Sequence, residues 1–209
     1  FLRETPTGMT ADIFQADRPA PALTPTYKSN LFLLPADRAL SREAETITSD
    51  FTRIFCLREY LGKLEKISLV LLDTPPSLGG LTLSALIAAT HLLIPVSCHL
   101  YTLQGTRDLL DTYRRVKSQL NPKLEILGVL ISDFDQRTAI SNEIAEQVIE
   151  MFGDQVFKTR IMHSVKIEEA AVKRQAVVDQ PRYCEAVDAY KQLAEEVAVR
   201  LNLATEVQI

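Results

Sequence analysis

The stretch from Leu69 to Gly80 reads LVLLDTPPSLGG: four aliphatic residues, an acid and a rigid Pro-Pro turn. A short apolar run bounded by turn residues predicts a buried strand, and such runs are typical of parallel sheets. Pro75 and Pro76 have no backbone donor and a fixed φ, so they set how the chain leaves the sheet. Acids at the carboxyl ends of parallel strands lie where open α/β sheets bind ligands. Asp73 is therefore placed either to hold a water on Mg²⁺ beside a phosphate or simply to end a strand at a turn.

Outward from this stretch, apolar runs alternate with helical patterns. The pattern predicts strands at 31–34, 67–72, 91–95, 124–131 and 156–157, and helices at 41–66, 81–89, 103–120, 139–152, 167–174 and 183–203. Such alternation predicts an α/β fold with a parallel twisted sheet flanked by helices. We expect one domain over 1–209, with an irregular Pro-rich segment at 1–28 and an α/β core at 29–203. A helical turn is expected near 9–15.

Composition narrows the class of protein. The 209 residues are 46% hydrophobic and fit one domain with an ample core. No apolar stretch reaches the roughly 18 residues of a membrane-spanning helix. The three cysteines are widely spaced and form no Cys-x-x-Cys motif, which favours buried thiols in a reducing compartment. A net charge of −4 argues against a generally basic DNA-coating protein, although a local basic patch remains compatible with it.

A longer run, LVLLDTPPSLGGLTLSALIAATHLLIPV from Leu69 to Val96, resembles the ParA/MinD family of deviant-Walker ATPases, above all its plasmid- and chromosome-partitioning branch. In that family a strand ends in Asp-x-Pro-Pro-Ser, a Leu-Thr-x-x-Ala-Leu helix follows, and the next strand ends near Pro-Val. The likeness covers roughly residues 30–200 in order. It continues through Leu103-Gln104-Gly105, Leu120-Asn121-Pro122, Ile126-Leu127-Gly128-Val129-Leu130, Asp133-Phe134-Asp135-Gln136-Arg137-Thr138 and Phe152-Gly153-Asp154-Gln155-Val156-Phe157-Lys158-Thr159.

The resemblance implies a P-loop NTPase-like fold and ATP-dependent DNA segregation, with ATP and Mg²⁺ as cofactors. It implies a homodimer that binds DNA non-specifically, a centromere-binding ParB-like partner that stimulates hydrolysis, and a cytoplasmic, nucleoid-associated location. MinD-type relatives attach to membranes through a basic amphipathic tail. Residues 198–209 contain one arginine and one glutamate, so no membrane partner is expected. The alternatives are a MinD-like positioning ATPase and a non-catalytic regulatory or interaction protein that keeps the fold.

The resemblance also assigns site residues. Asp73 would orient Mg²⁺ through water, and Thr74, Pro75 and Pro76 would lie in the switch that senses the γ-phosphate. Gly79 and Gly80 would give that switch backbone freedom. Nucleotide-base contacts are expected from Ser132, Asp133 and Met162, although Met162 and His163 replace the family's usual Pro-Arg. Non-specific DNA contacts are expected from five basic side chains, namely Arg137, Lys166, Arg160, Lys173 and Arg174.

One family element is missing from the sequence. A phosphate-cradling loop needs closely spaced glycines and a lysine. The chain has seven glycines, and none lies in a Gly-x-x-x-x-Gly-Lys arrangement. We expect a chain without its N-terminal strand and phosphate loop, with no catalytic residue of its own and no ATP hydrolysis alone. The rival explanation is a natural relative that has lost nucleotide binding. Without that central strand, its two neighbours would face a gap with unpaired backbone groups.

Overall fold

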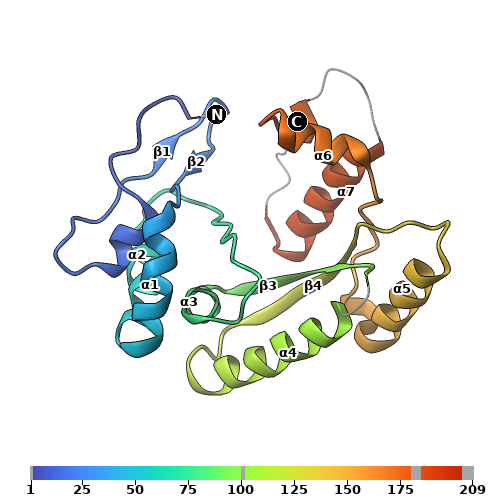
Figure 1. Ribbon diagram of the computed structural model, residues 1–209, viewed down its shortest axis with the longest axis horizontal. Helices are drawn as coiled ribbons and strands as arrows, with labels where there is room; N and C mark the ends of the chain where they lie inside the picture. The colour runs from blue at the N-terminus through green and yellow to red at the C-terminus, as the bar shows by residue number, and fades with distance from the viewer. Residues whose placement is uncertain (1, 100–101, 180–184, 204–209) are drawn as a thin grey trace. The chain divides into compact units, whose positions relative to one another are not determined.

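The computed structural model describes residues 2–99, 102–179 and 185–203, and the chain divides into two compact units. Unit 1 comprises Phe1–Thr90 and Thr112–Leu124, and unit 2 comprises His91–Asp111 and Glu125–Ile209. Figure 1 labels the elements of both. The single-domain boundaries at 1–209 stay a prediction.

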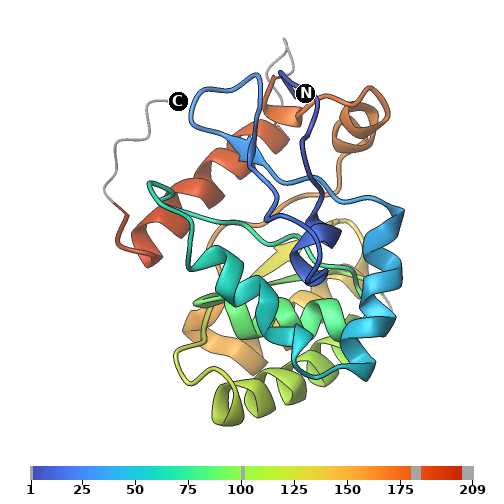
Figure 2. The same cartoon turned by 90° about the vertical axis from the view of Figure 1, so that its left-hand side faces the viewer.

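Unit 1 is mostly helical. Its elements are the 3-10 turn η1 (Thr10–Phe14), the strands β1 (Thr24–Pro25) and β2 (Phe32–Leu33), the helix α1 (Arg38–Ser49), the turn η2 (Arg53–Phe55), and the helices α2 (Cys56–Leu61) and α3 (Gly80–Ala88). It also contains the last part of α4 (Thr102–Gln119). The helical turn expected near 9–15 is confirmed as η1. Figure 2 shows α1 and α2 from the side.

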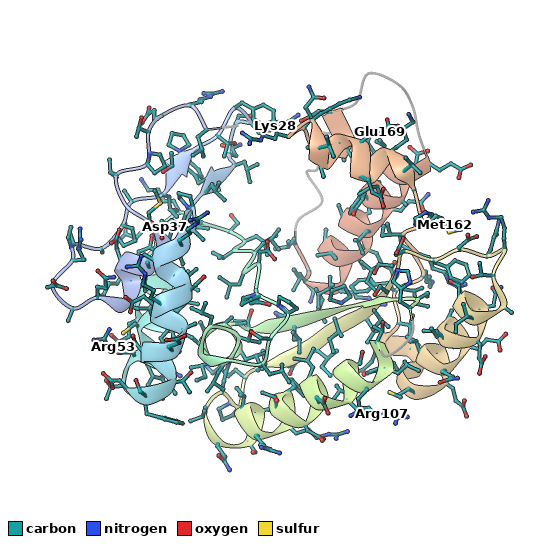
Figure 3. All side chains as sticks on the ribbon, in the orientation of Figure 1. Lys28, Asp37, Arg53, Arg107, Met162 and Glu169 are labelled. Atoms are coloured by element: carbon teal, nitrogen blue, oxygen red, sulfur yellow. The ribbon has the colours of Figure 1, made fainter. Side chains whose placement is uncertain are left out.

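The first helix begins earlier than the sequence predicted. Its N-cap is Asp37, whose side chain accepts a hydrogen bond from the backbone N–H of Ala39, so a start at Ser41 is wrong. Beyond the far end of α1, Arg53, which Figure 3 labels, pairs with Glu43 within the helix and with the C-cap residue Asp50. The cap fixes where α1 starts, and the ion pairs join it to η2.

Close packing in unit 1 depends on the glycine that opens α3. A Cβ at Gly80 would meet the carbonyl oxygen of Ala44 at 2.9 Å and Ile47 Cγ2 at 3.0 Å, both in α1. Gly80 therefore lets α1 and α3 approach each other, and it is buried. The helical conformation of Gly80 is open to any residue, so the close contact is what requires glycine in this structure, and the backbone freedom expected of Gly80 stays a prediction.

Two predicted strands of unit 1 do not form as buried strands. The run 67–72 has no strand assignment, and Leu69, Val70 and Leu71 are exposed, Leu71 by 83%. The run 31–34 contributes only the two exposed residues of β2, which pair antiparallel with β1. The run is aliphatic, as a strand requires, but a strand also needs a ladder partner, and the described residues give 67–72 none.

Unit 2 is built on a parallel pair of strands. β3 (His91–Ser97) and β4 (Glu125–Ser132) lie side by side in Figure 1 and are joined in parallel register from His91↔Glu125 to Ser97↔Ser132, with an irregularity after Leu92. The segment 156–162 follows the other edge of β4 through parallel bridges at Val129↔Val156 and Phe134↔Met162. The strands predicted at 91–95 and 124–131 are confirmed, and 156–157 forms an isolated bridge.

Helices cover both faces of this sheet. Their bounds are Ala139–Phe152 for α5, Val165–Val172 for α6 and Glu185–Arg200 for α7, and two 3-10 turns, η3 (Gly153–Gln155) and η4 (Val177–Asp179), lie between them. Ile94 and Val96 face a core that includes residues of α4 and α5. Leu93 and Leu130 face residues of α7 on the other side. Alternate strand residues thus bury opposite faces, the layering of an α/β fold.

An arginine at the end of α7 binds the backbone at the sheet edge. The Arg200 guanidinium donates to the carbonyl oxygens of Leu127, Gln155 and Val156 at 2.9–3.0 Å and lies 4.0 Å from the ring centroid of Phe157. These hydrogen bonds are charge-assisted and therefore stronger than bonds between neutral groups. Residues 183–184 of the helix predicted at 183–203 lie outside the described residues.

Candidate functional site

The acidic loop of unit 1 is held from the first turn of α3. The hydroxyl of buried Thr82 donates to the carbonyl oxygen of Ser77 at 2.6 Å and to that of Pro75 at 3.4 Å. Pro75 and Pro76 restrict φ on the amino side of this contact. The loop therefore has a defined course although it has no ladder partner. Thr82 was not singled out from the sequence, although its place six residues after Pro76 was a usable signal.

The carboxylate of Asp73 is exposed at the start of this loop, followed by exposed Thr74, Pro75 and Pro76. A carboxylate oxygen suits Mg²⁺, which binds through one or two carboxylates, several waters and substrate phosphates. Asp73 thus fits one part of a magnesium site. Among the residues described, no group of three or more His, Cys, Asp or Glu side chains is arranged to hold a metal ion.

A second set of predicted residues comes together in unit 2. Ser132 ends β4, and Asp133 follows it. Met162, which Figure 3 labels, lies beside them through its bridge to Phe134. Phe134 donates its backbone N–H to Ile161 at 3.1 Å, and His163 donates its own to Phe134 at 2.9 Å. Ser132, Asp133 and Met162 are therefore neighbours at the carboxyl end of β4, where α/β sheets present ligand-binding side chains.

Asp133 has two histidine partners that the sequence did not reveal. His99 Nε2 lies 2.5 Å from Oδ2, and His163 Nδ1 lies 2.7 Å from Oδ1. The hydrogen bond from His163, followed by that from His99, holds the pKa of Asp133 below its ordinary value despite partial desolvation. The hydrogen bond to Asp133 raises the pKa of His163. The usable signal was that His99 and Asp133 each follow a predicted strand.

Two of the five predicted DNA-binding side chains are engaged in ion pairs. Arg137 donates through Nε and Nη2 to the carboxylate of Asp135, both at 2.8 Å. This contact lowers the pKa of Asp135 to about 2 and raises that of Arg137. Lys166 binds Glu169 at 2.9 Å. A phosphate would have to compete with these carboxylates for both cations.

The other three predicted DNA contacts are placed differently. Arg160 lies 5.0 Å above the ring of Phe134, a cation–π geometry. Lys173 is the C-cap residue of α6, and Arg174 follows it with φ of 55°. All five basic residues belong to unit 2, and both Lys173 and Arg174 are exposed.

Comparison with known proteins identifies the family. A family model described as an AAA domain matches residues 9–126. The chromosome-partitioning ATPase Soj of Treponema pallidum is 36% identical over 178 residues, which are 85% of this chain and 70% of that protein. The chromosome partitioning protein ParA of Caulobacter vibrioides is 33% identical over 193 residues, 90% of this chain and 72% of that one. The chain belongs to the ParA/MinD family, in its partitioning branch.

The structural comparison agrees with this membership. Cobyrinic acid a,c-diamide synthase from Mycobacterium smegmatis, solved with bound ADP and magnesium, superposes with a TM-score of 0.73 at 26% identity, over 90% of this chain and 70% of that one. The ParA/MinD chain thus has the α/β fold of P-loop NTPases with a parallel sheet, as predicted. No helix within the described ranges is both long and apolar enough to cross a bilayer. Residues 204–209 of the expected non-membrane tail lie outside those ranges.

Proposed function

We propose that this chain acts in ATP-dependent partitioning of plasmid or chromosomal DNA. The observation that carries the proposal is the sequence similarity between this chain, over most of its length, and relatives named as partitioning proteins. The exposed Asp73 loop, which has the family's Asp-x-Pro-Pro-Ser sequence and is tied to α3 by Thr82, supports it.

The proposal gives each loop residue a task. Asp73 would accept a hydrogen bond from a water on Mg²⁺, and Thr74, Pro75 and Pro76 would form the wall that contacts the terminal phosphate. The ion supplies charge neutralisation at the transferred phosphoryl group. Thr82 would hold the loop at Ser77 so that Asp73 keeps its position. Ser132, Asp133 and Met162 in unit 2 are proposed to contact the nucleotide base.

The 209 residues contain no Gly-x-x-x-x-Gly-Lys arrangement that could cradle a phosphate. We propose that ATP binding needs a strand and Gly-rich loop outside these residues. The exposed aliphatic run 69–71 supports this, because apolar side chains of a strand-like segment favour burial by a neighbour. Calorimetry with Mg-ATP should detect no tight binding to the 209-residue chain. Tight binding would contradict this proposal and leave the partitioning role standing.

A test in cells addresses the partitioning role. Asp73→Asn in the protein as cells express it should raise the rate of plasmid loss or of DNA-free cells to nearly that of a deletion, because the neutral amide binds the water on Mg²⁺ more weakly. The control is Asp154→Asn, an exposed acid in η3 of unit 2, which should segregate DNA normally. Normal segregation in both variants and in the deletion would reject the function. A defect in the deletion alone would favour a non-catalytic role.

Non-specific DNA binding is proposed for Arg137, Lys166, Arg160, Lys173 and Arg174, with a second copy of the chain and a ParB-like protein as partners. Phosphate contacts release counterions, so binding should weaken steeply with salt. Arg137→Ala and Lys166→Ala should each weaken binding, and their effects should add. Arg107→Ala, on α4, is the control. Unchanged binding of the double variant at low salt would remove these two residues from the surface.

A further inference from the structure

Three titratable side chains meet where the strands of unit 2 end. His99 lies just beyond β3, Asp133 just beyond β4, and His163 just beyond the segment 156–162. One carboxylate uses both of its oxygens, Oδ2 for His99 and Oδ1 for His163. We propose that His99, Asp133 and His163 form a pH-responsive clasp that ties three loops together at the carboxyl edge of the sheet.

The clasp takes over where backbone pairing stops. The last backbone bond between the two strand ends joins the N–H of Cys98 to Ser132 at 3.2 Å. On the other side, the ladder ends with the N–H of His163 donating to Phe134. One residue past Ser132, the side chain of Asp133 reaches both neighbours at once. Side-chain hydrogen bonds of Asp133 therefore join the three segments one residue beyond the last backbone hydrogen bonds.

The backbone conformation of Asp133 is consistent with a side chain that is held by its two histidine neighbours. Its φ is 50°, in the left-handed region that non-glycine residues seldom occupy. Aspartate and asparagine accept this region better than other residues do, because their short polar side chains bond locally. The strain is compatible with a stable fold when neighbouring contacts hold the residue, and the two histidine bonds supply such contacts.

The surrounding charges act mainly on His163. Besides Asp133, the carboxylates of Glu168 in α6 and Asp135 in the β4 loop raise its pKa. Asp135 is itself bound to Arg137, and Lys166 is bound to Glu169, so these cations are offset. Arg160 and Asp133 act on the thiol of Cys98, whose pKa burial raises. The side chains of His99, Asp133 and His163 are 65%, 37% and 44% exposed, so protons reach the clasp from water.

The direction of the pH response follows from these shifts. The pKa of His163 is higher in the folded chain than its ordinary value of about 6.5, so its contribution is complete below that value and is lost as pH rises through the folded pKa. The pKa of Asp133 is lowered from about 3.8, so its contribution is present above that value and is lost as pH falls through the folded pKa. The clasp is thus closed in mildly acidic solution and loosens as pH rises.

NMR titration of the histidines tests the charge coupling. The chain has three histidines, so the signals of His91, His99 and His163 can be assigned by substitution. In Asp133→Asn, which suits the left-handed backbone, the titration midpoint of His163 should fall toward its ordinary value. His91→Gln, at the opposite end of β3, should leave that midpoint unchanged. An equal midpoint for His163 in the wild type and in Asp133→Asn would overturn the proposal.

Hydrogen exchange tests the mechanical consequence. The protection of the Phe134 and His163 amides, corrected for intrinsic exchange, should fall as pH rises through the His163 midpoint. In His163→Gln this loss should be smaller, because the imidazole whose pKa Asp133 raises is gone. In His99→Gln the protection should be lower at every pH, because one of the three loops is released. These exposed positions keep the test valid if Asp133→Asn fails to fold. The same pH profile in the wild type and both variants would overturn the clasp, whatever the outcome of the partitioning and nucleotide experiments.

Discussion

Two regions of the molecule have the same kind of sequence and different structures. The run 69–72 in unit 1 and the strand β4 in unit 2 are both aliphatic and both lead to an acid, Asp73 in one and Asp133 in the other. In β4, Val129 and Ile131 are fully buried between helices, with β3 on one edge and the segment 156–162 on the other. In 69–72, the aliphatic side chains are largely exposed and no ladder forms.

The difference shows that an aliphatic run is able to form a strand but does so only where a neighbouring strand pairs with it. Backbone N–H and C=O groups must be paired when buried, so a run without a neighbouring strand remains where water can reach it. The acid that follows each run is held differently as a result. Asp133 is bound by side chains from two adjacent segments, whereas Asp73 lies in a loop that the hydroxyl of Thr82 binds only through carbonyl oxygens further along the chain.

The largest expected effect comes from truncating one aromatic side chain beside β4. Phe157 is 2% exposed and packs with Leu130 and Ile161, so Phe157→Ala should lower the free energy of unfolding of unit 2 by about 3–5 kcal/mol. Leu71→Ala, in the exposed run, should change stability by less than about 0.5 kcal/mol. Urea unfolding followed by amide signals of each unit measures both. A cost at Leu71 comparable to that at Phe157 would show that the run is buried in solution.

Overpacking the same edge should have the next largest effect. A Cβ at Gly128 would clash with the Arg200 guanidinium and would lie 2.6 Å from the ring of Phe157 and 2.8 Å from the Gln155 oxygen. Gly128→Ala should therefore destabilise unit 2 by about 1–3 kcal/mol. Its control is Gly105→Ala in α4, where a Cβ meets nothing within 4 Å and the helix should gain about 0.5–1 kcal/mol. Equal thermal midpoints for the two variants would argue against the Arg200 contact.

The sequence predicted most of unit 2 and less of unit 1, for physical reasons. Local patterns place β3, β4 and the helices after them, because their partners lie within the same chain. The sequence also indicated a loop at Asp-x-Pro-Pro-Ser and the end of a strand at Ser132 and Asp133, because each of these segments follows an aliphatic run. The absence of a strand at 67–72 depends on a neighbour that periodicity cannot report. The histidine contacts of Asp133 depend on how three loops converge, which spacing along the chain does not encode.

A smaller effect is expected from releasing the loop of Asp73. Thr82→Val keeps the shape of the side chain and removes the hydroxyl that binds Ser77 and Pro75. Because water can replace this donor at the exposed carbonyls, the cost should be only about 0.5–1.5 kcal/mol. Limited proteolysis should nonetheless cut 73–79 faster. Thr46→Val, which removes an exposed hydroxyl bond within α1, should leave that cutting rate unchanged. Unaltered cutting in Thr82→Val would mean that the prolines alone fix the loop.

The smallest expected effect on stability comes from breaking the exposed ion pair between Arg137 and Asp135, where the change is in the pKa of Asp135. Arg137 lowers the pKa of Asp135 to about 2 through hydrogen bonds and charge, so the stabilisation is present above about 3.8 and is lost as pH falls through about 2. In Arg137→Ala, the carboxyl carbon signal of Asp135 should titrate at higher pH. In the matched variant Lys166→Ala, the pKa of Glu169 should rise and Asp135 should not change. Because both pairs are exposed, stability at neutral pH should hardly change in either variant.

If Asp135 titrates identically with and without Arg137, the pair does not persist in solution, and Arg137 is then available to a phosphate without competition.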